Sequence, residues 1–94
     1  MKHIICIKLV DNSDDHMIKV KELLLSMKGK VPMLEDIWVG TDFLHSARSF
    51  DIVMVADLTS KEVLDDYQND PYHAGVVKAY LSTVAEKIIA IDCE

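Results

Sequence analysis

The chain has 94 residues, half of them apolar, and its 16 acidic and 10 basic residues give a net charge of −6. This composition favours a small globular domain over a disordered segment, and its acidic balance argues against a nucleic-acid-binding surface. We expect one domain over residues 1–94, which buries only about 60–65% of its unfolded surface and gains stability if it self-associates.

The first half of the chain predicts a strand, a helix and a second strand. Residues 3–10 are β-formers and apolar on both faces except at Lys8, which is typical of a central strand. Residues 14–28 show helical spacing of apolar side chains, and Gly29 is expected to end that helix. Residues 34–40 alternate as a strand, with Leu34, Asp36 and Trp38 expected on one face.

The second half predicts a strand, a broken helix and a last strand. Residues 50–58 carry apolar side chains at every even position, and residues 59–62 match a capping box that starts a helix through Tyr67. Asp70 then suits an N-cap and Pro71 the first position of a new helix, which is expected to run to about residue 86. Residues 87–92 form the final strand.

The resulting order is β-α-β-β-α-β, which predicts an α+β, ferredoxin-like subunit with both helices on one face of an antiparallel sheet. The first and third strands are then central. The uncovered face would carry Ile4, Cys6, Val53 and Val55, and an apolar face of that size is typical of an interface. We therefore expect a homodimer in which the sheets stack, with a polar edge at Lys8, Asp51 and Asp57.

No segment indicates a membrane or a secreted protein. The apolar run at residues 4–10 is interrupted by a lysine and followed by an aspartate, without a cleavage site, and no stretch reaches the roughly 20 apolar residues of a span. We expect a cytoplasmic protein whose Cys6 and Cys93 stay reduced. The cysteines and the four histidines show no metal-ligand spacing, so no metal site is expected.

Strand alternation places one candidate site on the covered face of the sheet. His3 shares that face with Ile5 and Ile7, Tyr67 faces the same cleft from the second helix, and His73 begins the next helical piece above it. We predict a mostly apolar small-molecule pocket with these three polar side chains at its mouth. Its predicted walls are Ile5, Ile7, Met54, Ala56 and Leu64.

The protonation of His73 is open at this point. The positive end of the new helix favours a neutral ring, whereas the negative Asp70 favours a charged one. Each side chain also has a purely structural interpretation. Tyr67 could be a core tyrosine, His73 a helix-terminal residue, and His3 a residue that ends a strand.

Several short motifs resemble the stress-responsive dimeric α/β-barrel (Dabb) family. They are Lys2-His3-Ile4-Ile5, Val31-Pro32, Trp38-Val39-Gly40, Phe50-Asp51 and, above all, Tyr67-x-x-x-Pro71-x-His73. The resemblance covers essentially the whole chain and implies a ferredoxin-like subunit whose homodimer forms a β-barrel. The chain is similar in length and motif order to one plant member of the family, a polyketide cyclase that uses no metal or organic cofactor.

The resemblance to the cyclase implies that His73 removes a proton next to a carbonyl, that Tyr67 orients the substrate, and that His3 lines the pocket. Asp70 differs, because the cyclase has another histidine there. The sequence therefore predicts one of two functions: a module that binds a small apolar or carbonyl-bearing ligand, or a cofactor-independent proton-transfer enzyme. A third, a monooxygenase-like relative, has no specific residue in its favour.

Overall fold

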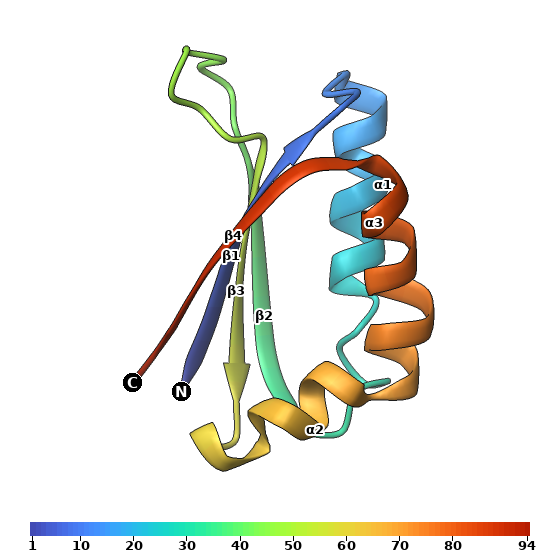
Figure 1. Cartoon of the computed structure of the whole chain (residues 1–94), viewed down its shortest axis with the longest axis vertical. Helices are drawn as coiled ribbons and strands as arrows, with labels where there is room; N and C mark the ends of the chain where they lie inside the picture. The colour runs from blue at the N-terminus through green and yellow to red at the C-terminus, as the bar shows by residue number, and fades with distance from the viewer.

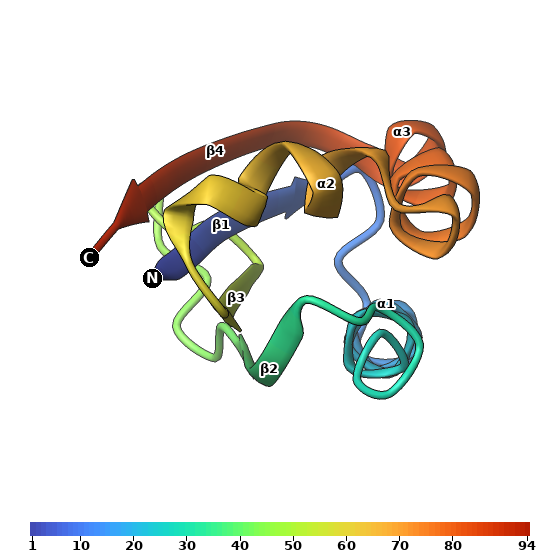
Figure 2. The ribbon, with the colours of Figure 1, turned by 90° about the horizontal axis from the view of Figure 1, so that it is seen from below.

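The computed structural model describes all 94 residues, which form one antiparallel sheet covered by helices on a single face (Figures 1 and 2). The elements in order are β1 (Lys2–Leu9), α1 (Asp14–Leu25), β2 (Leu34–Thr41), β3 (Ile52–Leu58), η1 (Lys61–Val63), α2 (Leu64–Asn69), η2 (His73–Lys78), α3 (Ala79–Val84) and β4 (Ala85–Cys93). The strand order is β2-β3-β1-β4. The ferredoxin-like prediction, with the first and third strands central, is confirmed.

Strict alternation along β1 separates the core from the opposite face. His3, Ile5, Ile7 and Leu9 are buried on the side that the helices cover, whereas the intervening residues are half-buried. On β3 the buried positions are Ile52, Met54, Ala56 and Leu58. These two central strands, together with the inner stripes of α1 and α3, supply most of the core.

Strand β2 departs from the predicted alternation at its first residue. Leu34 was expected beside Asp36 and Trp38, but it is only 6% exposed and lies on the covered side. A register shift between Leu34 and Asp36 makes Leu34 face Leu58 and Asp36 face Asp57 of β3. The extra residue of this bulge inverts the side on which Leu34 projects, which a regular period of two cannot anticipate.

Helix α1 is shorter than its apolar period suggests. It ends at Leu25 rather than at residue 28, and residues 26–30 form turns. Gly29 adopts φ +87°, a conformation that side-chain-bearing residues rarely take, so it fixes the end of these turns.

The segment between β3 and β4 is built in four pieces. The predicted capping box is wrong, because the N-cap is Ser60 rather than Thr59, it makes no side-chain cap bond, and the first turn is the 3₁₀ turn η1. The Asp70 cap is confirmed: its Oδ1 accepts the backbone N–H groups of Tyr72 and His73 at 2.9 and 3.2 Å. The turns from His73 to Lys78 are π-helical, and the chain enters β4 at Ala85, earlier than expected.

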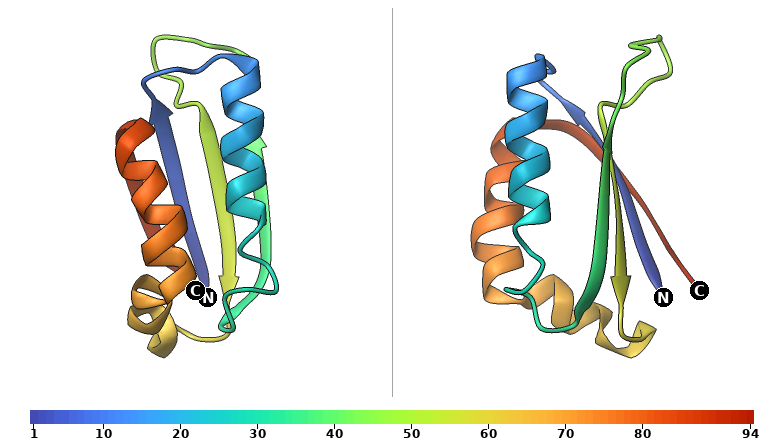
Figure 3. Two further views of the ribbon diagram at one scale, coloured as in Figure 1. Left: turned by 90° about the vertical axis from the view of Figure 1, so that its right-hand side faces the viewer. Right: turned by 180° about the vertical axis from the view of Figure 1, so that it is seen from behind.

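The face of the sheet away from the helices is open, as Figure 3 shows from behind. The predicted apolar residues of β1 and β3 lie there, and β2 and β4 add the exposed side chains Trp38, Ile89 and Ile91. Trp38 lies across Gly40, where an added Cβ would come within 2.6 Å of the indole Cη2. Only glycine at position 40 leaves room for the ring in this orientation.

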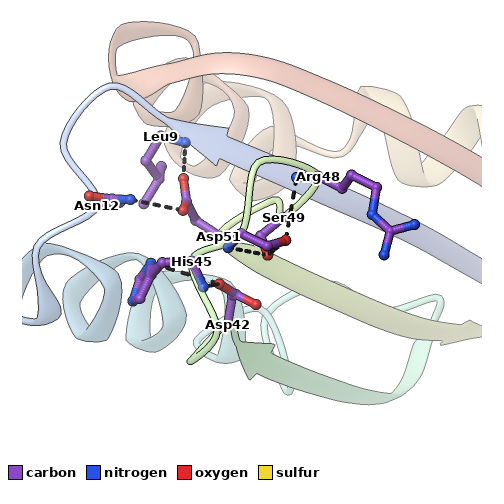
Figure 4. A network of polar contacts seen from close by, with 8 residues as sticks. Leu9, Asn12, Asp42, His45, Arg48, Ser49 and Asp51 are labelled. Carbon is purple, nitrogen blue, oxygen red and sulfur yellow. Dashed lines mark hydrogen bonds and ion pairs between the residues drawn. The ribbon is translucent and has the colours of Figure 1, made fainter.

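Asp51 was expected at the polar edge of that open face, and this expectation is wrong. The residue is 5% exposed and precedes β3, where its carboxylate accepts the Leu9 N–H at 2.7 Å and the Asn12 amide at 3.2 Å (Figure 4). A second pair of bonds joins the backbones: Asp51 donates to Ile7 at 2.9 Å and accepts from Asp42 at 2.8 Å. Asp51 therefore ties the end of β1 to the loop before β3.

None of the helices is long and apolar enough to cross a membrane.

Candidate functional site

The three polar residues predicted to converge lie in contact at one end of the covered sheet face. The ring centroids of His3 and Tyr67 are 5.4 Å apart in an edge-on arrangement, and those of Tyr67 and His73 are 4.3 Å apart. They come from β1, α2 and η2, respectively. The helix break at residues 69–71 makes this possible, because it lets the chain turn back over the tyrosine ring.

His3 is held by a residue that the sequence analysis did not single out. Its Nδ1 lies 2.5 Å from the Oδ1 of Asp92, which stands directly opposite it in the pairing of β1 with β4. Because a carboxylate only accepts, the His3 Nδ1 carries the hydrogen, and in the neutral ring Nε2 is the acceptor. Asp92 could have been found from the sequence, because the predicted fold pairs the first strand, which holds His3, with the last strand, which holds Asp92.

His73 is also fixed at one nitrogen. Its Nδ1 lies 3.2 Å from the Gln68 carbonyl oxygen, so this nitrogen donates and Nε2 is the free acceptor of the neutral ring. Burial lowers the pKa of His73 below its ordinary value, against the raising effects of the Gln68 bond and Asp70. Desolvation thus decides the question that the sequence left open, and His73 is a neutral imidazole near pH 7.

Tyr67 is fully enclosed, and its hydroxyl does not face a cavity. The side chain is 0% exposed, and Oη donates to the Met27 sulfur at 3.9 Å. Burial raises the pKa of this phenol far above its ordinary value, with Asp70 and Asp92 adding to the effect. Tyr67 therefore stays protonated and presents its ring, rather than its oxygen, to the two histidines.

Beside the histidines lies a cavity of about 300 Å³ between β4 and the helical segment η2–α3. Its lining is mostly apolar, with two imidazoles and one ammonium group among nine residues: His3, Ile5, Gln68, His73, Lys78, Leu81, Ser82, Ile88 and Ala90. Its volume is at the small end of the range of ligand pockets.

This cavity shares only part of the predicted wall. His3, Ile5 and His73 line it, whereas the other predicted wall residues do not. Ile7, Met54 and Ala56 are closed into the core at 0–1% exposure, and Leu64 packs against that core. The space lies near the edge of the sheet because the helices leave the inner side of β4 uncovered, where Ile88 is 44% exposed.

The side chains of this site suit binding and proton transfer. Lys78 offers a hydrogen-bond donor, and the free Nε2 of a neutral His73 can accept a proton or a hydrogen bond. Nowhere in the structure do three or more histidine, cysteine, aspartate or glutamate side chains form a group that could hold a metal ion.

Comparison with known families identifies the chain. The model of the stress responsive A/B barrel domain, Dabb, matches residues 1–94. The chain belongs to the Dabb family. No curated protein matches this Dabb chain.

Solved structures share the fold of this Dabb protein at low sequence identity. A dimeric ferredoxin-like protein of unknown function from Thermobifida fusca is 24% identical, with a TM-score of 0.78 over 96% of this chain and 85% of its own. A Dabb family protein from Mesorhizobium loti is 14% identical, with a TM-score of 0.74 over 99% and 93%. The hydroxynitrile lyase from Passiflora edulis is 16% identical, with a TM-score of 0.78 over 96% and 87%.

Proposed function

We propose that this Dabb protein is a homodimer that binds a small, largely apolar, carbonyl-bearing molecule in the cavity between β4 and η2–α3. The main support is the lining of this cavity, which is mostly apolar but includes the ammonium group of Lys78 and the neutral imidazole of His73, with its free acceptor nitrogen. Lys78 would donate to the carbonyl oxygen, and the Nε2 of His73 would accept from an adjacent hydroxyl or enol.

The homodimer proposal rests on the open sheet face. Ile4 and Val55 are cross-strand neighbours there, and Trp38 and Ile91 flank them at 59% and 64% exposure. Contiguous apolar surface of this kind is typical of an interface. The Thermobifida fusca structure with the same fold is described as dimeric.

Replacement of Val55 by glutamate tests the dimer. A desolvated charge at the centre of the stacked sheets should dissociate it, so light scattering should give a monomeric mass for Val55→Glu and a dimeric mass for the wild type. Lys21→Glu, on the helical side, is the matched control and should remain dimeric. A monomeric wild type at micromolar concentration would disprove the dimer.

Binding is tested by NMR titration with benzoylacetone, an apolar β-diketone, against butylbenzene, which lacks the carbonyl groups. We expect benzoylacetone to shift the signals of His73 and Ser82 and to bind more tightly than butylbenzene. Lys78→Met should weaken benzoylacetone about threefold to tenfold, the effect of one hydrogen bond, and leave butylbenzene unchanged. Equal binding of both compounds would reject the proposed recognition.

A proton-transfer enzyme is the second candidate. It is favoured by the neutral ring of His73, whose Nδ1 is hydrogen-bonded to Gln68 and whose Nε2 is free. Here His73 is the base that removes the proton between the two carbonyls, and Tyr67 acts as its partner by holding the imidazole with its ring. The measurement is exchange of that proton for deuterium. Loss of a general base lowers such a rate about 10²–10⁴-fold, so His73→Ala should do so. Binding without accelerated exchange would leave the binding module alone.

A further inference from the structure

The largest hollow of the molecule is a different one, a groove of about 650 Å³ between α1 and the helical segment η2–α3. Its walls are one face of α1 and the facing side of the π-helical and α3 turns: Lys19, Glu22, Leu23, Ser26, Tyr72, Gly75, Val76 and Tyr80. None of these residues lines the histidine cavity. Figure 3 shows α1 and α3 side by side on the covered face, so a partner on the open sheet face would leave this groove accessible.

Hydrogen bonds in the groove wall use up its hydroxyl protons. The Ser26 hydroxyl donates to the Leu23 carbonyl at 2.5 Å, and its Oγ lies 2.6 Å from the Tyr72 Oη. Because Ser26 has only one hydroxyl hydrogen, the hydrogen between these two oxygens belongs to Tyr72. The Tyr72 oxygen therefore keeps free lone pairs and has no hydrogen left to donate.

The second tyrosine follows the same logic. His16 Nδ1 lies 2.6 Å from the Asp11 carbonyl oxygen and must donate to it, so in the neutral ring Nε2 is an acceptor. The Tyr80 Oη lies 3.1 Å from that Nε2 and donates to it. With these bonds, neither tyrosine hydroxyl has a hydrogen left to donate, and each oxygen can still accept one.

The side chains that line the groove carry one charge of each sign, from Lys19 and Glu22. The ammonium groups of Lys19 and Lys30 lie over the rings of Tyr80 and Tyr72, 5.3 and 4.8 Å from the centroids, and repel a cation. The carboxylate of Glu22 lines the same groove and repels an anion, so it offsets the attraction of the Lys19 ammonium group for one. A neutral molecule that brings its own hydrogen-bond donor is the complement of this surface.

The lack of a side chain at Gly75 keeps this part of the groove open. Gly75 lies in the π-helical turns, where glycine costs about 0.5–1 kcal/mol relative to alanine, and its φ is not in the left-handed region. A Cβ added there would meet nothing within 4 Å, so the protein's own packing does not require glycine. A side chain at position 75 would instead fill the groove.

We propose that this groove is a second small-molecule site, which binds a neutral aromatic or apolar compound carrying a hydroxyl group. The hydroxyl donates to a tyrosine oxygen, and the apolar body packs against Leu23, Val76 and the open face of Gly75. This site is independent of the histidine cavity and of whatever that cavity binds.

The test compares β-naphthol with β-naphthyl methyl ether, which has the same ring but no donor, and with the anion β-naphthoate. In isotope-labelled protein, β-naphthol should shift the amide signals of Leu23, Gly75 and Val76. It should bind about threefold to tenfold more tightly than the ether, the difference made by one hydrogen bond. Tighter binding of the ether or of β-naphthoate, or shifts confined to His3 and Ser82, would overturn the proposal.

Three variants separate binding in the groove from non-specific hydrophobic binding. Gly75→Leu should weaken β-naphthol at least about tenfold because its side chain occupies the groove, whereas Gly75→Ala should keep most of the affinity. The double variant Tyr72→Phe, Tyr80→Phe should bind β-naphthol and its ether equally. If Gly75→Leu, which favours the helix, binds β-naphthol as the wild type does, the proposal fails even if the double variant does not fold.

Discussion

Two buried polar clusters lie at opposite ends of β1. They differ in whether their side chains keep hydrogen-bonding atoms that no protein group satisfies. At the Leu9 end, the carboxylate of Asp51 is consumed by a backbone N–H and an amide within the protein. At the other end, His3 and His73 are each tethered at Nδ1 and line a cavity. A satisfied buried group holds the fold together, whereas a half-satisfied one retains the capacity to meet a ligand.

The strongest way to break this comparison is to remove Asp51. Asp51→Ala leaves the buried Leu9 N–H without its charged acceptor and should lower the free energy of unfolding by about 3 kcal/mol. Urea denaturation measures the loss. Asp51→Asn, which keeps an acceptor oxygen, should cost about 1 kcal/mol. A cost below about 1 kcal/mol for the alanine variant would show that the Asp51 cluster is not structural.

Asp92→Ala is the corresponding change at the other end. The Asp92 side chain is 36% exposed, so its bond to His3 is partly screened, and the loss should be about 1 kcal/mol or less. Binding of benzoylacetone should nonetheless weaken, because His3 loses the group that fixes its ring. A loss of stability as large as that of Asp51→Ala would erase the distinction between the two clusters.

The pH dependence of stability sharpens the comparison further. Since burial lowers the pKa of His73 in the folded protein, the unfolded chain takes up that proton first as the pH falls. The contribution of His73 is therefore complete above its unfolded pKa of about 6.5 and is lost as the pH falls through the folded pKa. The difference in unfolding free energy between wild type and His73→Gln should shrink over that range. A constant difference would show that folding does not lower the pKa of His73.

The smallest effect is expected for Tyr67→Phe. The hydroxyl has only a long bond to the Met27 sulfur, so the free energy of unfolding should change by less than about 1 kcal/mol. Benzoylacetone binding and any deuterium exchange should be unchanged, because the ring that contacts His73 remains. A strong loss of either would assign the Tyr67 oxygen a direct part in the site.

The sequence was sufficient for the order of elements, the Asp70 cap and the placement of His3 on the covered face, because these follow from local periodicity and backbone preferences. It failed at the bulge of β2, where one extra residue inverts Leu34, and at Asp51, whose partners come from another part of the chain. Both depend on tertiary pairing, which no local pattern encodes.

The candidate site was predictable to a similar depth. The convergence of His3, Tyr67 and His73 followed from alternation and the helix break. The cavity beside them with its Lys78, the bond of Asp92 to His3, and the inward direction of the Tyr67 hydroxyl did not. They depend on how far β4 extends past the helices and on the π-helical turns, which begin at His73 without a distinct composition.

The position of Trp38 across Gly40 gives the molecule a built-in optical probe. Trp38 is the one tryptophan of the chain, and on the isolated subunit it is 59% exposed on the open sheet face. Indole emission shifts to shorter wavelength when water is excluded, so association through this face would change the intrinsic fluorescence without any label. The helical face has no tryptophan. Ligands that bind in the histidine cavity or in the groove therefore should not change the Trp38 emission, which reports on association of the subunits alone.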